Sequence, residues 1–304
     1  MRHRVFVTGA TGYLGSAIAH RLVKAGHTVF GLTRDAGRAR ALGAAGIQPV
    51  LGDLAESDSF LHQMKNCDAV VHAAAEPGPN QAARDQQALE AIQHAVEDGR
   101  VRHVIYTSGV WVHGDTGGRI HDESAALDPA PLVAWRPAHE EVVMDLGTHG
   151  ARAIVMRPGM VYGGSRGVLG GWFGEARDQG SITYVGGDQH WNMVHVDDVA
   201  SAYALALDHA GNGARYLLVD ESHFTVRELA EAAAAAVGVP AQAMSAEQAI
   251  VMMGDYGRAL LLDSQATAAR ARRELGWTPM HTSFVAEAKA LDSEWQAGQG
   301  TRVG

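Results

Sequence analysis

The sequence of 304 residues is short of several residue types, and each shortage excludes a kind of protein. A single cysteine, Cys67, leaves no internal disulfide, which fits a reducing compartment. No stretch approaches about 18 uninterrupted apolar residues, so no membrane-spanning helix is expected. Lys and Arg number 25 against 34 Asp and Glu, and the formal net charge of −9 argues against a nucleic-acid partner. Apolar sequence begins at Val5 without room for a signal peptide, so we expect a cytoplasmic protein.

Lysine is the scarcest basic residue. The chain contains only Lys24, Lys65 and Lys289, so the stretch from Asn66 to Ala288 has no lysine at all. Any chemistry in that stretch that needs a cation must therefore use arginine or histidine.

Histidine, by contrast, is abundant, with 16 residues. His190 and His195 stand five residues apart, and neither an HExxH nor a CxxC motif is present. No metal site is predicted from these spacings.

In the first half of the chain, short apolar runs alternate with helical patterns, which is typical of strands and helices around a parallel sheet. After the first run, Leu14, Ile18 and Leu22 recur at helical spacing. We expect strands at residues 4–8, 28–33, 48–51, 69–73, 103–107 and 153–157, with helices at 13–25, 36–45, 57–64, 81–98 and 132–146.

The pattern changes after Pro158. The stretch 159–187 is rich in glycine and contains Trp172 and Phe173, so it is expected to be a loop-rich insertion. A helix at 196–209 and a strand at 216–219 resume the first pattern. Further helices are expected at 226–237, 264–275 and 283–295.

The segment between the first strand and the first helix reads Thr8-Gly-Ala-Thr-Gly-Tyr-Leu-Gly15. Gly9 permits a tight turn, Gly12 lets the backbone approach a pyrophosphate, and Gly15 lets the helix pack on the strand. The helix would present its free N–H groups to the phosphates. The strand before and the helix after the loop predict a dinucleotide site.

The second strand ends where a site for NAD usually has an acidic residue that holds the ribose. Here it ends at Arg34, with Arg38 four residues further on, and arginine suits the 2′-phosphate of NADP. Asp35 is adjacent, but it can instead cap the next helix. We therefore expect NADP(H) in preference to NAD(H).

Taken together, these motifs resemble those of the extended short-chain dehydrogenase/reductases, in the branch of the NAD-dependent epimerases and dehydratases. The resemblance spans about residues 3–295 and rests on several ordered motifs. They are the glycine loop, Gly52-Asp-Leu54, Val71-His-Ala-Ala-Ala75, Tyr106-Thr-Ser-Gly109, Arg157-Pro-Gly-Met-Val-Tyr-Gly163, His195-Val-Asp-Asp-Val199 and Glu274-Leu-Gly-Trp-Thr-Pro279.

The resemblance implies an α/β fold, with a Rossmann-type doubly wound parallel sheet and a smaller C-terminal substrate-binding lobe. The first domain is expected at 1–162 and 190–220, and the lobe at 163–189 and 221–304. Homodimerisation through the helices at 81–98 and 132–146 is also implied. The residues expected at the cofactor are Gly9, Thr11, Gly12, Tyr13, Leu14, Arg34, Asp53, Leu54, Ala73, Ala74, Ala75, Thr107, His139, Pro158, Met160 and Val161.

The sequence departs from the family at its catalytic pair. The family's chemistry uses a Tyr-x-x-x-Lys pair, in which the tyrosine exchanges the proton and the lysine holds the nicotinamide ribose. Here Trp135 stands at the tyrosine position and His139 at the lysine position. An indole N–H only donates hydrogen bonds, so Trp135 cannot act as a general acid, whereas His139 titrates near neutrality.

Other residues are candidates for the lost role. Ser108 precedes Gly109, which aligns with the family's usual serine, and His113 falls where the family often has a tyrosine. Each candidate also has a purely structural interpretation, as a core aromatic, a solvated histidine or a loop histidine. Trp111, Tyr162 and Trp172 are expected to line a pocket for an apolar or cyclic substrate.

Three functions remain open at this point. The first is an NADP-dependent oxidoreductase that reduces a small carbonyl compound, with Ser108 polarising the oxygen and His139 or His113 supplying the proton. The second is a non-catalytic NADP-binding redox sensor or regulator. The third is a non-redox isomerase or cyclase on the same fold, because fold alone does not determine function.

Overall fold

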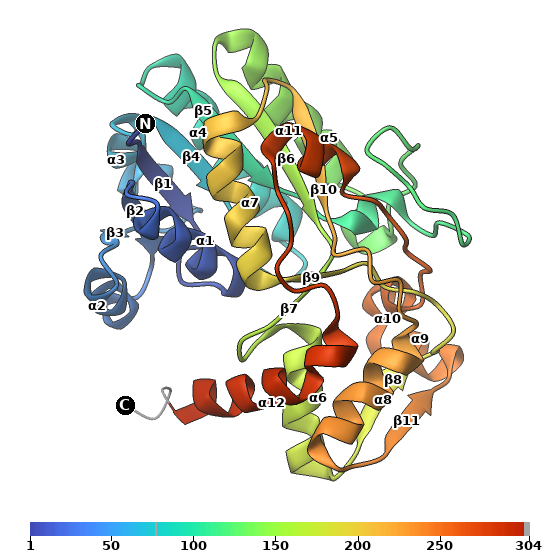
Figure 1. Ribbon diagram of the computed structural model, residues 1–304. Coiled ribbons are helices and arrows are strands. Elements are labelled where there is room, and N and C mark those ends of the chain that lie inside the picture. Colours follow the sequence, from blue (N-terminus) through green and yellow to red (C-terminus); the bar gives the residue numbers. More distant parts are fainter. Residues whose placement is uncertain (77, 301–304) are drawn as a thin grey trace.

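A seven-stranded parallel sheet forms the centre of the protein (Figure 1). The computed structural model describes residues 1–76 and 78–300. The strand order is β10-β6-β5-β4-β1-β2-β3, and every neighbouring pair is parallel. The strands are β1 (Arg4–Thr8), β2 (Thr28–Thr33), β3 (Gln48–Leu51), β4 (Ala69–His72), β5 (His103–Thr107), β6 (Arg152–Pro158) and β10 (Ala214–Leu218). The strand order reverses beside β1, where β4 lies on one side and β2 on the other, and such a point opens a ligand crevice at the strands' carboxyl ends.

Helices cover both faces of this sheet. Along β1, Val5 and Val7 pack with one group of helices and Phe6 packs with the other, so the strand is apolar on both faces. The first group is α1 (Tyr13–Lys24), α2 (Ala36–Ala44), α7 (Val196–His209) and α11 (Ala269–Leu275). The second is α3 (Leu61–Lys65), α4 (Gln81–Glu97) and α5 (Arg136–Asp145). The predicted Rossmann-type doubly wound sheet is confirmed.

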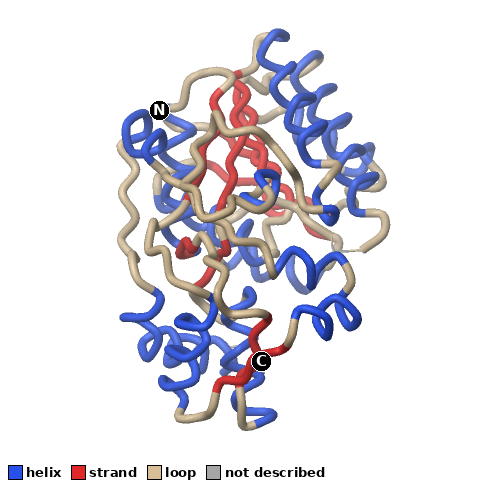
Figure 2. Tube along the Cα trace, turned by 90° about the vertical axis from the view of Figure 1, so that its right-hand side faces the viewer, coloured by secondary structure: helices blue, strands red, loops and turns tan. Residues whose placement is uncertain are grey.

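A smaller lobe lies at one end of the sheet and has its own apolar core (Figure 2). Its helices are α6 (Gly167–Gln179), α8 (Val226–Val237), α9 (Ala246–Met253), α10 (Asp255–Leu260) and α12 (Phe284–Gly300). Two short parallel pairs accompany them: β7 (Met160–Tyr162) with β9 (Met193–His195), and β8 (Ile182–Val185) with β11 (Ala241–Met244).

The predicted loop-rich insertion at 159–187 is wrong. In its place the chain forms β7, α6 and β8. The four residues Leu169, Trp172, Phe173 and Ala176 repeat at the spacing of one helix face and are all buried. Burial of this apolar face stabilises α6 by more than its glycines lower the helix propensity. The helical spacing of the apolar residues therefore predicts this segment better than its glycine content does.

Several other boundaries differ from the sequence prediction; the helix expected at 264–275, for example, begins only at Ala269. The helix expected at 132–146 begins only at Arg136, because a 3₁₀ turn over Pro131–Val133 precedes it. Within the stretch assigned to the lobe, α11 and Trp277 pack in the core of the main sheet. Residues 301–304 of the predicted lobe lie outside the described part of the chain, and the two-domain division stays a prediction.

Candidate active site

The glycine loop is shaped for a dinucleotide. Gly9 has φ +70, and a Cβ at this residue would lie 2.6 Å from the carbonyl oxygen of Ala73. A Cβ at Gly15 would collide with the carbonyl of Gly9. Gly12 begins α1 in an extended conformation and supplies no side-chain cap, so the first N–H groups of the helix remain available for an anion. These residues fit a pyrophosphate, and a side chain at Gly9 or Gly15 would fill the space.

The carboxyl ends of β1 and β4 are tied together beside this loop. The hydroxyl of Thr8 accepts hydrogen bonds from the backbone N–H groups of Ala73 and Ala74, at 3.2 and 3.4 Å. The same hydroxyl lies 2.7 Å from Nδ1 of His72. These hydrogen bonds fix the start of the segment after β4 beside the glycine loop.

Charged side chains gather at the outer end of the crevice. Arg34 pairs with Glu76 at 3.2 Å and with Asp53 at 3.6 Å, and Arg84 pairs with the same two carboxylates at 2.9 and 3.8 Å. These partners raise the pKa of Arg34 above its ordinary value. Asp35 accepts a hydrogen bond from the N–H of Arg38 and caps α2. Its carboxylate is thus used locally and does not have to bind a ribose.

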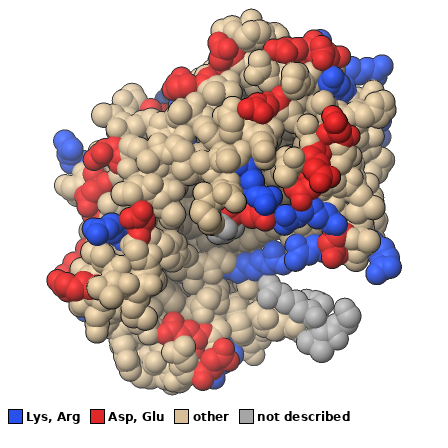
Figure 3. All heavy atoms as spheres, turned by 180° about the vertical axis from the view of Figure 1, so that it is seen from behind, with Lys and Arg blue, Asp and Glu red and all other residues tan. Residues whose placement is uncertain are grey.

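A cavity of about 910 Å³ lies between the main sheet and the lobe. Seen from behind, the surface is hollowed between these two parts, with acidic and basic side chains beside the hollow (Figure 3). Of the predicted site residues, the cavity is lined by Tyr13, Ser108, Trp111, Trp135, Pro158, Met160 and Val161. Leu54, Ala74 and Ala75 line a small neighbouring pocket. His113, His139, Tyr162 and Trp172 line neither of the two.

The carboxyl end of β5 and the start of α5 bring three polar side chains to the cavity. Ser108 is 6% exposed, and its Oγ has no hydrogen-bond partner within the described ranges. Trp135 and Arg136 both line the cavity, and the guanidinium lies 4.7 Å from the centre of the indole. Arg136 also donates to the carbonyl of Thr107 at 2.8 Å. A hydroxyl, an indole and a cation thus line the same cavity near the point where the strand ends.

His139 is held by a carboxylate that the sequence analysis missed. Its Nδ1 lies 2.6 Å from Asp85, which also accepts from Nε2 of His72 at 3.0 Å and from the hydroxyl of Tyr106 at 2.9 Å. Burial alone would raise the pKa of Asp85, but the hydrogen bonds from His139 and His72 hold it well below its usual range. Asp85 is therefore an ionised acceptor of three hydrogen bonds.

The position of His139 is behind the cavity wall. Its ring meets that of Trp135 edge to face, with centroids 4.8 Å apart. Since Trp135 lines the cavity and His139 does not, a proton from His139 would have to pass beside the indole to reach a substrate.

His113 is placed away from the cavity. Its Nε2 lies 3.0 Å from Nη1 of Arg157, whose guanidinium is also bound by both oxygens of Glu140. Burial and the Arg157 charge lower the pKa of His113 to about 4, so the ring is neutral near pH 7. The structure therefore offers no support for His113 as the proton donor, and its contacts are those of a structural residue.

Tyr162 and Trp172 also lie elsewhere than expected. Both belong to the core of the lobe, where Tyr162 is fully buried and Trp172 stacks on Trp191 at 5.9 Å. Their apolar surface is used for packing, so of the three expected substrate contacts only Trp111 reaches the cavity.

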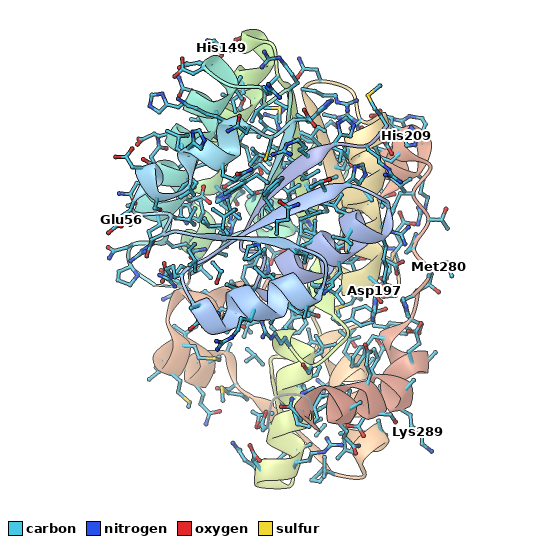
Figure 4. All side chains as sticks on the ribbon, turned by 90° about the vertical axis from the view of Figure 1, so that its left-hand side faces the viewer. Glu56, His149, Asp197, His209, Met280 and Lys289 are labelled. Atoms are coloured by element: carbon cyan, nitrogen blue, oxygen red, sulfur yellow. The ribbon has the colours of Figure 1, made fainter. Side chains whose placement is uncertain are left out.

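One cluster of possible metal ligands exists where sequence spacing indicated none. Ligand atoms of His195, Asp197 and His281 lie within 4.8 Å of one another, and Asp197 stands at the start of α7 (Figure 4). However, Nδ1 of His195 accepts from the N–H of Asp197, and Nδ1 of His281 contacts Glu287 at 2.6 Å. The two rings stack at 3.7 Å. These contacts give the three residues a role in joining α7 to the start of α12.

Sequence reasoning also missed Arg136. It lines the cavity together with Tyr256, which meets Trp111 edge to face at 6.2 Å. A signal for Asp85 was present, since it shares a helical spacing with Ala88, Leu89 and Ile92, all buried. An acid on an apolar face needs a buried partner.

The sheet, the glycine loop and the cavity define an enzyme of the extended short-chain dehydrogenase type that binds a nicotinamide dinucleotide. The NAD dependent epimerase/dehydratase family matches residues 5–218, and the chain belongs to this family. None of the helices in the described chain has the length and apolar character needed to cross a membrane.

Individual relatives differ in what they do. UDP-glucose 4-epimerase of Mycolicibacterium smegmatis is 30% identical over 316 residues, covering 95% of this chain and 97% of that protein. A ketoreductase of Stigmatella aurantiaca, which acts on 4-hydroxy-2-methyl-3-oxo-4-farnesyl-3,4-dihydroquinoline-1-oxide, is 26% identical and covers 97% and 96%. The structure of dTDP-glucose 4,6-dehydratase from Streptomyces venezuelae with NAD bound superposes with a TM-score of 0.85 at 21% identity, covering 98% of both chains. The last likeness concerns the fold alone.

Proposed function

We propose that the protein is an NADP(H)-dependent oxidoreductase that reduces the carbonyl group of a small apolar or cyclic compound. The observation that carries this proposal is the cavity at the carboxyl end of β5, where the free hydroxyl of Ser108 faces walls that include Trp111, Trp135 and Met160. Such walls suit an apolar ring better than a nucleotide sugar. The ketoreductase relative supports the same reaction class.

In this proposal the nicotinamide, when bound, supplies the hydride. Ser108 donates a hydrogen bond from Oγ to the substrate's carbonyl oxygen, and Trp135 donates a second one from its indole nitrogen. Both donors stabilise the negative charge that develops on that oxygen. Neither the hydroxyl nor the indole gives up its proton near neutral pH, so the proton must come from another group.

His139 is the proposed source of that proton. Asp85 holds Nδ1 of His139 at 2.6 Å and fixes the orientation of the ring, while Nε2 makes no hydrogen bond within the described ranges. A water molecule beside Trp135 would carry the proton from Nε2 to the oxygen. Transfer of that proton leaves a neutral imidazole, which recovers its proton from solvent.

The proposed preference for NADP(H) rests on Arg34. This arginine is largely exposed at the end of β2, and it is already turned toward Asp53 and Glu76. A 2′-phosphate carries more negative charge than either carboxylate, and ion pairs with exposed carboxylates stabilise little, so the phosphate can replace them at the guanidinium. With Asp35 capping α2, no free acid follows the strand directly to repel the phosphate.

The missing Tyr-x-x-x-Lys pair favours a second candidate, a non-catalytic NADP-binding sensor. Trp135 fills the tyrosine position in van der Waals range of His139, and no lysine occurs between Asn66 and Ala288. This candidate has tight cofactor binding without hydride transfer. A non-redox isomerase or cyclase would turn over substrate without consuming NADPH.

The test is NADPH consumption with a panel of aromatic and alicyclic ketones, followed by single substitutions. Ser108→Ala is expected to lower kcat about 100-fold while cofactor binding stays unchanged. Ser293→Ala, an exposed serine on α12, is the matched control and should leave kcat unchanged. Cofactor binding without consumption of NADPH for every ketone would replace the reductase by one of the two alternatives.

Homodimerisation through α4 and α5 and a cytoplasmic location stay predictions. Light scattering of the purified protein tests the first, and a substitution on the exposed face of α4 that leaves the mass unchanged would contradict it.

A further inference from the structure

Arg136 is a cation without an acidic partner. It is half-buried in the cavity wall, and among the residues that the structure describes no carboxylate oxygen lies within 4 Å of its side-chain nitrogens. Its one hydrogen bond goes from Nη1 to the carbonyl of Thr107, which leaves the other N–H groups of the guanidinium available. The indole of Trp135 supports its flat face.

The local field at Arg136 favours an anion further. Arg136 is the first residue of α5, a helix of ten residues, and Trp135 caps this helix without any side-chain hydrogen bond. Pro137 has no N–H, so the free N–H groups of Arg136 and Ala138 are those that add partial positive charge beside the guanidinium. Two independent sources of positive potential therefore coincide at one point of the cavity wall.

The rest of the cavity does not neutralise this charge. The single acidic residue in its described lining is Asp255, which is exposed and faces Arg258 at 3.8 Å. Most other walls are apolar, including Leu132, Val133 and Val161. Beside such walls Arg136 is partly removed from water. An anionic group on the ligand would therefore stabilise its charge.

The phosphates of the dinucleotide are a poor match for this anion. Their place is the glycine loop at the end of β1, whereas Arg136 donates to the end of β5, two strands away in the order β5-β4-β1. Arg136 instead borders Ser108, because the residue whose carbonyl it binds directly precedes that serine.

We propose that Arg136 forms a carboxylate-binding subsite, and that the substrate is an apolar oxo acid. The guanidinium binds the carboxylate while Ser108 receives the carbonyl oxygen of the same molecule. Since the two groups are neighbours at the end of β5, the carbonyl lies one or two carbons from the carboxylate, as in a 2-oxo or 3-oxo acid. The reduction itself rests on the proposed function, whereas the carboxylate subsite does not.

The first experiment compares 2-oxo-4-phenylbutanoate with its ethyl ester, which keeps the carbonyl and the ring but removes the charge. The wild-type protein is expected to favour the acid about tenfold or more in kcat/KM. Arg136→Gln is expected to bring the acid-to-ester ratio close to one, mainly through KM. Arg136→Lys keeps the positive charge but loses the planar guanidinium that donates two parallel hydrogen bonds to a carboxylate. It should therefore retain part of the preference for the acid.

The second experiment measures binding without turnover. Calorimetry with 4-phenylbutanoate and with 4-phenylbutanamide, each with and without NADP⁺, is expected to show at least tenfold tighter binding of the acid, lost in Arg136→Gln. Arg21→Gln, an exposed arginine on α1, is the control that should keep the difference. Thermal unfolding of every variant shows that the comparison is made between folded proteins.

The outcomes separate this inference from the proposed function. Tight, Arg136-dependent binding of the acid without NADPH consumption keeps the subsite and removes the reductase. Turnover with equal preference for acid and ester keeps the reductase and overturns the subsite. Equal loss of NADP⁺ binding and acid binding in both Arg136 variants would assign Arg136 to the dinucleotide and also overturn it.

Discussion

The buried carboxylate of Asp85 lies 2.6 Å from Nδ1 of His139, the residue at the family's lysine position. The two residues come from α4 and α5, and Asp85 also joins His72 and Tyr106. Through His72 the hydrogen bonds continue to Thr8, directly before the glycine loop. The residue proposed to supply the proton is thus connected to the dinucleotide loop by a continuous buried network.

Asp85→Asn tests this network. The amide of the variant has no negative charge, and its nitrogen donates hydrogen bonds instead of accepting them. It cannot replace the carboxylate in all three hydrogen bonds, so we expect the free energy of unfolding to fall by about 3 kcal/mol. We also expect kcat to fall, because Nδ1 of His139 loses the anionic partner that orients the ring. Urea unfolding and steady-state kinetics measure the two effects.

Tyr106→Phe is the matched control for Asp85→Asn. It removes one donor and leaves the carboxylate, so about 1 kcal/mol of stability is expected to be lost. In the Asp85→Asn background, His139→Gln should add little further loss of kcat, because the two residues act as a unit. Fully additive losses would contradict the proposed coupling.

The pH dependence of stability reports on His113. Its folded pKa of about 4 lies below the ordinary histidine value, so the unfolded chain binds a proton first as the pH falls. Stability is therefore complete above about pH 7 and is lost as the pH falls toward 4. From pH 7.5 to 5, the wild type is expected to lose about 2 kcal/mol more than His113→Gln. Equal losses would show that His113 is already charged in the folded protein.

The glycine loop predicts a sharp contrast between two substitutions. Gly9 has a positive φ, and in Gly9→Ala the new Cβ would collide with the backbone of Ala73. The loop would have to shift away from the pyrophosphate, so dinucleotide affinity should fall about 100-fold or more. Gly171→Ala, in α6, meets nothing within 4 Å and should raise stability by about 0.5–1 kcal/mol with unchanged affinity. Calorimetric titration and thermal unfolding distinguish the two.

The proposed preference for NADP(H) can be tested at Arg34. Arg34→Gln is expected to weaken NADPH binding about tenfold and to leave NADH binding unchanged, since only NADPH offers a phosphate to this position. Arg21→Gln is again the control for a general loss of positive charge. Equal effects of Arg34→Gln on both cofactors would assign Arg34 to the adenosine common to both.

The arrangement of strands and helices was readable from the sequence because it depends on local periodicity. The helix boundaries 196–209 and 226–237 and the strand 28–33 coincide with those of the structure. The glycine loop was recognisable because its strand, turn and helix are contiguous in the chain. The helix α6 was missed because the prediction for residues 159–187 relied on their glycine content instead of the spacing of their apolar residues.

The site was less readable because its contacts are long-range. Asp85 and His139 are 54 residues apart, and no local pattern pairs them. His113 stands in a plausible sequence position, yet the buried pair of Arg157 and Glu140 fixes it outside the cavity. Trp172 was expected in the substrate pocket but lies in the core of the lobe. An aromatic side chain suits either place, and only the packing of the folded chain distinguishes them.

Whether the protein is an NADP(H)-dependent reductase is decided by calorimetric titration of the wild type with NADPH, NADP⁺, NADH and NAD⁺, followed by NADPH consumption with 2-oxo-4-phenylbutanoate. We expect tighter binding of NADPH than of NADH, together with turnover of the oxo acid. If none of the four dinucleotides binds, the glycine loop of Gly9, Gly12 and Gly15 is not a dinucleotide site, and the proposed function is wrong.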